Sequence, residues 1–194
     1  MQKTPPIIAV ILCGGESLRM GKNKALLKYH KTPQYQYLSS LCQNLNLEVL
    51  LSCKATHASN FKGTNKFIFD EMQFENAGPM TGLLSAMQAY PNAAILLLAC
   101  DYPYLNESAI EKLVTAFGSN HKSVCYFNKQ SQMSEPVLAV YHPSNKKLIE
   151  EAYRAGTHSL QQILKGIKPF RVEPNEAKII KSFDTPADFE SFAK

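Results

Sequence analysis

The apolar residues of the chain gather in short uninterrupted runs rather than at every second position. The run Ile7–Cys13 is rich in β-branched residues, and Ala94–Cys100 is apolar throughout. Such runs are typical of strands that are buried on both faces of a parallel sheet. We predict seven strands, at Ile7–Cys13, Glu48–Cys53, Lys66–Phe69, Ala94–Cys100, Ser123–Phe127, Val137–Tyr141 and Lys168–Val172.

Between the predicted strands, apolar residues recur three and four positions apart, as on one face of a helix. In Pro79–Tyr90 this stripe consists of Met80, Leu83, Leu84 and Met87, and the leading proline suits a first helical turn. The same reasoning predicts helices at Pro33–Leu45, Glu107–Phe117, Lys146–Arg154, Ser159–Leu164 and Thr185–Phe192.

Because strands and helices alternate along the chain, we predict an α/β fold, a three-layer α/β/α sandwich around a mostly parallel, Rossmann-like sheet. No repeat, low-complexity tract or linker divides the sequence, so residues 1–194 are expected to form a single domain. Ligands of such folds bind beyond the carboxyl ends of the strands. We therefore expect ligand-binding and catalytic residues in the loops that follow the first and fourth predicted strands.

The composition narrows the class of protein. Of the 194 residues, 45% are hydrophobic and 19% are charged, and the formal net charge is +5. A mild positive charge without a basic run favours a small anionic ligand over nucleic acid. The run Ile7–Cys13 is far shorter than the ~20 residues of a membrane span, and no signal-peptide pattern precedes it. Five cysteines without a C-x-x-C pair indicate a reducing, cytoplasmic setting.

The loop after the first predicted strand, LCGGESLRMGKNKALL (Leu12–Leu27), combines glycines with cations. It fits neither the G-x-G-x-x-G fingerprint, because Gly14 and Gly15 are adjacent, nor the spacing of a Walker A loop. The residue types still suit phosphate, because glycines let backbone N–H groups approach oxygen atoms while Arg19 and Lys24 neutralise charge. A glycine turn with solvated cations would have the same composition.

The fourth predicted strand ends in an aspartate, within LLLACDYPYL. At the carboxyl end of a buried strand, Asp101 can cap the following turn or hold a divalent metal. Mg²⁺ prefers one or two carboxylates together with phosphate oxygens, so an aspartate beside a phosphate-binding loop would be consistent with the second role.

Taken together, the motifs resemble those of the molybdenum cofactor guanylyltransferases, which have a MobA-like nucleotidyltransferase fold of the nucleotide-diphospho-sugar transferase type. The family pattern L-x-G-G-x-S-x-R-M-G-x-x-K-x-L-L begins at Leu12, the G-P-L-x-G motif begins at Gly78 with Met80 replacing leucine, and the D-x-P motif begins at Asp101. The segments SEPVLAVY and FDTPADFESF resemble later family motifs. The Gly-Gly form of the first motif leans towards guanylyl transfer, whereas cytidylyltransferases more often have Ala-Gly.

The resemblance implies a role for each matching residue. Four residues would bind the nucleoside, namely Leu12, Cys13, Gly14 and Asp70. Three would hold the triphosphate, namely Gly15, Arg19 and Lys24. Asp101 would be the ligand of the Mg²⁺ cofactor, which makes Arg19, Lys24 and Asp101 the candidate catalytic residues.

The activity implied by the resemblance is transfer of GMP from GTP to the phosphate of molybdopterin, with release of pyrophosphate. That phosphate is already anionic, so positioning and charge stabilisation would suffice without a general base. The expected partners are GTP and the molybdopterin cofactor, with transient contacts to other proteins of molybdenum cofactor synthesis. Transfer from CTP or to a sugar phosphate remains an alternative, as does a non-catalytic nucleotide-binding module.

Two positions depart from the family pattern. Ser52 stands where many members have asparagine at the end of the second strand, and Asp184 stands where the C-terminal motif usually has asparagine. Two roles for Asp184 remain open, a cap of the last helix or a second metal ligand, as a distal acidic residue is in related transferases. Two roles also remain open for Glu135, contact with the acceptor or orientation of a loop.

Overall fold

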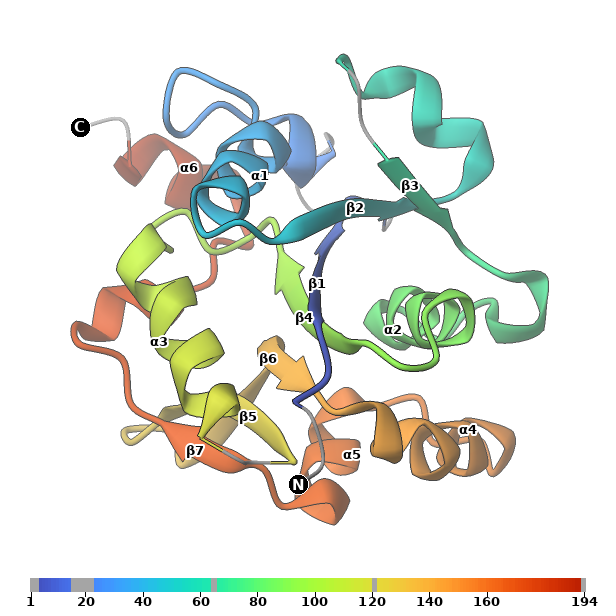
Figure 1. Ribbon diagram of the computed structural model, residues 1–194. Coiled ribbons are helices and arrows are strands. Elements are labelled where there is room, and N and C mark those ends of the chain that lie inside the picture. Colours follow the sequence, from blue (N-terminus) through green and yellow to red (C-terminus); the bar gives the residue numbers. More distant parts are fainter. Residues whose placement is uncertain (1–3, 15–22, 64–65, 120–121, 193–194) are drawn as a thin grey trace.

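The computed structural model describes residues 4–14, 23–63, 66–119 and 122–192. Their strands form one seven-stranded sheet in the order β3-β2-β1-β4-β6-β5-β7 (Figure 1). The strands are β1 (Ile7–Leu12), β2 (Glu48–Cys53), β3 (Lys66–Phe69), β4 (Ala94–Ala99), β5 (Ser123–Asn128), β6 (Met133–Tyr141) and β7 (Phe170–Val172). All seven predicted strands are therefore present.

The sheet is mostly parallel, as predicted. β1 pairs in parallel with β2 and β4, β2 with β3, and β5 with β7, whereas β6 runs antiparallel to both of its neighbours. β6 begins at Met133, four residues before the predicted start, and its pairing with β5 shifts register between Cys125 and Tyr126. Pro136 lies in the shifted stretch, where a residue without an N–H is tolerated because the ladder is interrupted.

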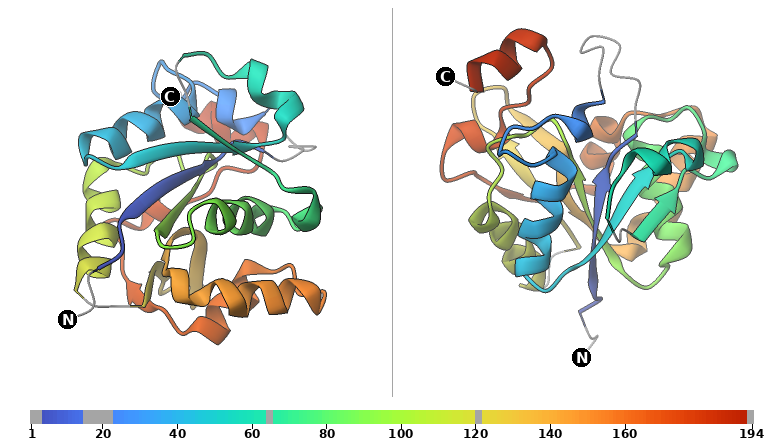
Figure 2. Two further views of the ribbon diagram at one scale, coloured as in Figure 1. Left: turned by 45° about the vertical axis from the view of Figure 1, so that its right-hand side comes forward. Right: turned by 90° about the horizontal axis from the view of Figure 1, so that it is seen from above.

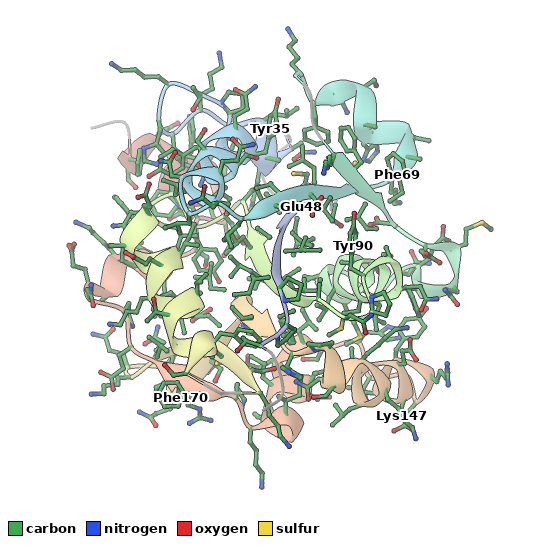
Figure 3. All side chains as sticks on the ribbon, in the orientation of Figure 1. Tyr35, Glu48, Phe69, Tyr90, Lys147 and Phe170 are labelled. Atoms are coloured by element: carbon green, nitrogen blue, oxygen red, sulfur yellow. The ribbon has the colours of Figure 1, made fainter. Side chains whose placement is uncertain are left out.

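Helices cover both faces of the sheet and complete the predicted three layers (Figures 1 and 2). One face packs on α1 (Gln34–Asn44) and α3 (Glu107–Gly118), and the other packs on α2 (Pro79–Ala89), α4 (Lys146–Arg154) and α5 (Leu160–Ile167). Successive residues of β1 alternate between the two cores, because neighbouring side chains of a strand point to opposite faces. Figure 3 shows side chains filling the space on both sides of the sheet, with Tyr35 of α1 among them.

The last helix, α6 (Pro186–Phe192), covers neither face of the sheet directly. It lies beside the loop that follows the short 3₁₀ helix η1 (Lys24–Leu26), at the carboxyl edge of the strands (Figure 2). No helix among the described residues is long and apolar enough to cross a bilayer. The fold thus brings the beginning and the end of the chain together at the edge where ligands of α/β proteins bind.

Candidate active site

The first part of the site lies where β1 and β2 end. Cys13 N and Gly14 N both donate hydrogen bonds to Ser52 O, over 2.8 and 3.1 Å. These bonds carry the pairing of the two strands one step beyond β1 and hold Gly14 at the surface. A Cβ atom added to Gly14 would lie 3.8 Å from Asp70 Oδ2, so this carboxylate faces the first glycine of the loop.

Asp70 follows β3 and approaches Ser52. Ser52 Oγ donates to Asp70 Oδ1 over 3.5 Å, and partial burial raises the pKa of Asp70 above its ordinary value. Leu12 and Gly14 border the same region. The structure thus brings together the residues predicted to contact the nucleoside, although they come from the ends of two different strands, β1 and β3.

The second glycine of the G-P-M-T-G segment allows α2 to approach this region closely. A Cβ atom added to Gly82 would lie 2.4 Å from Ser52 Oγ and 2.8 Å from Leu12 Cδ2. Any side chain there would push α2 away from the ends of β1 and β2. Gly78, just before α2, has a φ of 57°, in the range that favours glycine.

Lys24 enters the site from η1. The start of η1 is capped by Asn23, whose Oδ1 accepts from Ala25 N and whose Nδ2 donates to Cys13 O over 3.1 Å. Asn23 therefore ties the far end of the glycine-rich loop back to the end of β1. The sequence analysis did not single out Asn23, although its strong preference for helix N-caps is a usable signal. Gly15 and Arg19, both predicted to bind phosphate, lie outside the described residues.

Asp101 directly faces Lys24. Its Oδ2 lies 3.8 Å from Lys24 Nζ, and its Oδ1 is buried and has no hydrogen-bond partner among the described residues. Burial raises the pKa of Asp101 to about 6, although the neighbouring ammonium of Lys24 lowers it. A buried carboxylate oxygen without a partner costs free energy unless a cation or donor completes it.

Asp184 completes a three-residue charge cluster. Its Oδ1 lies 2.7 Å from Lys24 Nζ, and its Oδ2 accepts from Ser182 Oγ over 3.3 Å. The proposed role of Asp184 as the cap of the last helix is wrong. Asp188 Oδ2 accepts instead from the backbone of Asp184 and Thr185, and Thr185 Oγ1 accepts from Asp188 N, which is the reciprocal arrangement of a capping box.

Aromatic side chains fix the position of the C-terminal segment. The ring of Tyr29 packs edge-on against Phe183, Phe189 and Phe192, with centroids 5.1–5.9 Å apart. The backbone N–H of Phe183 donates to Asp101 O over 2.7 Å. This anchorage sets where Asp184 lies, and the sequence analysis did not predict it.

Glu135 of β6 lies near Asp101, close enough for the two charges to interact. It accepts a 3.0 Å hydrogen bond from the hydroxyl of Tyr102, and burial raises the pKa of Glu135. This bond links β6 to the loop after β4, as expected for a residue that orients a loop. Tyr102 is itself buried, and its hydroxyl makes this link.

β1 and β4 each end one residue earlier than predicted, so Cys13 and Cys100 directly follow these strands. Both are buried. Burial raises the pKa of the Cys13 thiol well above its usual range, which disfavours the reactive thiolate.

The residues of the cluster fit a hard divalent cation. Asp101 and Asp184 supply carboxylate oxygens, and Asp101 keeps one oxygen unpartnered. No three His, Cys, Asp or Glu side chains within the described ranges are grouped so as to hold a metal by themselves. A pair of carboxylates suits Mg²⁺, because this ion takes most of its ligands from water and from substrate phosphates.

Comparisons with known proteins identify the family to which the chain belongs. The family model described as MobA-like NTP transferase domain matches residues 9–173. The molybdenum cofactor biosynthesis bifunctional protein of Synechocystis sp. is 31% identical over 186 residues, covering 95% of this chain but 53% of that protein, so the chain spans about half its length. The molybdenum cofactor guanylyltransferase of Ectopseudomonas mendocina is 26% identical over 183 residues, covering 93% of this chain and 89% of that one.

The fold has a counterpart among solved structures. The molybdopterin-guanine dinucleotide biosynthesis protein A from Archaeoglobus fulgidus matches with a TM-score of 0.74 at 18% identity, covering 95% of each chain. At that identity the likeness concerns the fold. The family model, however, spans both the glycine-rich loop and Asp101 and covers most of the chain. The protein therefore belongs to the family of MobA-like NTP transferase domains.

Proposed function

We propose that the protein is a molybdenum cofactor guanylyltransferase, which transfers GMP from GTP to the phosphate of molybdopterin. One observation carries the proposal: the Lys24 ammonium lies beside the half-buried Asp101 carboxylate, at the sheet edge where Gly14 and Asp70 also meet. A cation next to a carboxylate with an unpartnered oxygen suits a triphosphate that arrives with a metal. Proteins named for this activity are among the relatives of the chain.

In the proposed reaction an oxygen of the acceptor phosphate forms a bond to the α-phosphorus of GTP. The bond from that phosphorus to the bridging oxygen of the β-phosphate breaks, and pyrophosphate leaves with the electron pair. Lys24 holds and neutralises phosphate oxygens, together with Gly15 and Arg19 of the same loop, and Asp70 orients the nucleoside. A Mg²⁺ ion held by Asp101 would supply further charge stabilisation on the phosphates.

The setting proposed for this activity is the cytoplasm. All five cysteines are free thiols, which suits a reducing compartment. The fold needs no disulfide to close its core, because two large apolar clusters already pack on the sheet.

Pyrophosphate release tests the proposal. The protein is incubated with Mg²⁺, molybdopterin and one of GTP, CTP, ATP or UTP, and then with GTP and a sugar phosphate in place of molybdopterin. We expect release with GTP and molybdopterin and much less in the other mixtures. Faster release with CTP would replace the assignment by a cytidylyltransferase, and nucleotide binding without any release would replace it by a non-catalytic binding module.

A further inference from the structure

The loop that follows β4 is held in place by hydrogen bonds to its backbone oxygens. Three consecutive residues accept them: Asp101 O from Phe183 N over 2.7 Å, Tyr102 O from Gln34 Nε2 over 3.4 Å, and Pro103 O from His30 Nε2 over 2.7 Å. The bond from His30 is the shorter of the two that come from side chains. It reaches a residue two positions beyond the candidate metal ligand Asp101.

The partner of His30 determines its tautomer. A carbonyl oxygen can only accept, so the bond to Pro103 O needs a hydrogen atom on His30 Nε2. The His30 ring is also held by two other rings. It stacks on Tyr37 of α1 with centroids 3.8 Å apart and packs edge-on with Phe192 of α6 at 5.1 Å. The ring is therefore fixed with its donor aimed at the loop after β4.

His30 also belongs to a closed loop that adjoins Lys24. Gln34 N donates to Leu27 O over 2.8 Å, which closes the segment of residues 27–34 at its base. Leu27 N donates in turn to Lys24 O over 3.2 Å, at the end of η1. Lys24 is thus joined directly to the base of this 27–34 loop, and the bond from His30 fastens the same loop to the segment that carries Asp101.

We propose that His30 is a positioning residue for the reaction: by donating to Pro103 O it holds the 27–34 loop against the loop after β4, and so sets where the Lys24 ammonium stands relative to the Asp101 carboxylate. The inference rests on the proposed function, because it takes these two groups as the ones that bind phosphate and metal. His30 acts through the backbone of the two loops and is assigned no contact with substrate.

The direct contact between Lys24 and Asp101 is too loose to set their spacing. Lys24 Nζ lies 3.8 Å from Asp101 Oδ2, beyond hydrogen-bond length, and ion pairs that water reaches hold side chains weakly. The two residues also lie on different segments, η1 and the loop after β4. A displacement of about 1 Å at a site can lower turnover about 10²-fold, so a bond that fixes the two segments matters to the reaction.

Packing by the ring and donation by Nε2 are separable roles of His30. His30→Phe keeps an aromatic ring against Tyr37 and removes the donor to Pro103 O. His30→Gln removes the ring and keeps an amide N–H donor on a side chain of similar reach. A residue that only packs would be replaced better by phenylalanine, whereas a residue that positions the loop would be replaced better by glutamine.

The first test is calorimetric titration of GTP into the full chain over a series of Mg²⁺ concentrations, without acceptor. For His30→Phe we expect the Mg²⁺ midpoint to rise about tenfold, the usual scale for loss of a residue that orients a metal site. His30→Gln should have a midpoint close to that of the unmodified protein. Tyr126→Phe is the matched control, because it removes a 2.8 Å bond from a side chain to Ala109 O and should leave the midpoint unchanged.

A second test needs neither metal nor nucleotide. In EDTA the backbone amides of residues 101–105 should exchange with deuterium about fivefold faster in His30→Phe, because one hydrogen bond that holds this loop is lost. Tyr126→Phe should not change these rates. In the unmodified protein, nitrogen NMR of the His30 ring should show the hydrogen on Nε2, and this measurement does not depend on any variant being stable.

Three results would overturn the inference: a Mg²⁺ midpoint that moves no further in His30→Phe than in Tyr126→Phe, unchanged exchange at residues 101–105, or a His30 Nε2 without hydrogen. Equal rises of the midpoint in His30→Phe and His30→Gln would overturn it too, because the ring and not the donor would then matter. The proposed function fails differently. If Mg²⁺ does not alter GTP binding to the unmodified protein, the metal at Asp101 is wrong, whatever the exchange rates show.

Discussion

The backbone N–H of Phe183 donates a 2.7 Å hydrogen bond to the backbone oxygen of Asp101. This bond joins the C-terminal segment to the carboxyl end of β4, at the residue that carries the candidate metal-binding carboxylate. Asp184, the residue after Phe183, meets Lys24, whose ammonium also lies 3.8 Å from Asp101 Oδ2. The active edge of the sheet is therefore completed by a segment that belongs to no strand.

Asp101→Asn should lower activity while raising stability. Burial raises the pKa of Asp101 to about 6 from an ordinary 3.8. Between these two pH values the Asp101 carboxyl is therefore protonated in the folded protein and ionised in the unfolded chain. Above pH 6 the charged form opposes folding, and the variant should be more stable than the unmodified protein by at most about 3 kcal/mol. The advantage should disappear as the pH falls towards 4.

Thermal melts of both proteins in EDTA between pH 4 and 8 measure this difference, and pyrophosphate release measures activity. We expect turnover to fall at least about 10²-fold, because the charge of the carboxylate is lost. The argument from burial would be contradicted if the stability gained by Asp101→Asn over the unmodified protein were smaller at pH 8 than at pH 4.

Lys24→Ala should reduce kcat/KM by about 10²-fold or more, the scale for loss of one charged donor to the reacting phosphates. Lys28→Ala removes an equal charge from an exposed position four residues later and should have little effect. Steady-state kinetics with GTP at saturating Mg²⁺ compare the two variants. Equal losses in both would mean that Lys24 acts only through the general charge of this surface.

Gly82→Ala should destabilise the fold by about 1–3 kcal/mol, the usual range for overpacking a tight contact. The new methyl group would lie 2.4 Å from Ser52 Oγ and 2.8 Å from Leu12 Cδ2, inside the region proposed to bind the nucleoside. Gly118→Ala is the matched control, because a Cβ atom there meets no neighbour within 4 Å.

Chemical denaturation gives both free energies of unfolding. Adding Ser52→Ala to Gly82→Ala should restore part of the loss, because the nearest atom is then absent. If Gly82→Ala is as stable as Gly118→Ala, the close approach of α2 to β1 and β2 is not a constraint on this position.

Tyr29→Phe should leave stability unchanged or raise it by about 1 kcal/mol. The Tyr29 hydroxyl is buried without a partner among the described residues, so its removal relieves a desolvation cost and keeps the packing against α6. Tyr126→Phe should instead lower stability by about 1 kcal/mol, because the Tyr126 hydroxyl donates a buried 2.8 Å hydrogen bond to Ala109 O. Melting temperatures of the pair, measured side by side, would refute this account if they shift in the same direction.

The amino-acid sequence by itself determined the elements and the chemistry of the loops. Runs such as Ala94–Ala99 are buried on both faces, so their composition reports directly on their environment, and all seven strands were predicted. Gly14, Lys24 and Asp101 could be singled out as candidates because the roles predicted for them depend on residue type beside a strand end. The start of β6 could not, because Met133–Pro136 is mixed in polarity and is paired through a register shift that only its neighbours impose.

The tertiary structure alone decided the partners of the charges. Near the last helix, Asp184 and Thr185 are both acceptable N-caps by residue type, and the structure assigns the N-cap to Thr185, with Asp188 completing the capping box. Asp184 then meets Lys24 across 160 residues of sequence. Such a contact depends on how Tyr29 packs against α6 and on where β4 ends, and no local pattern encodes a distance between segments that only the finished fold brings together.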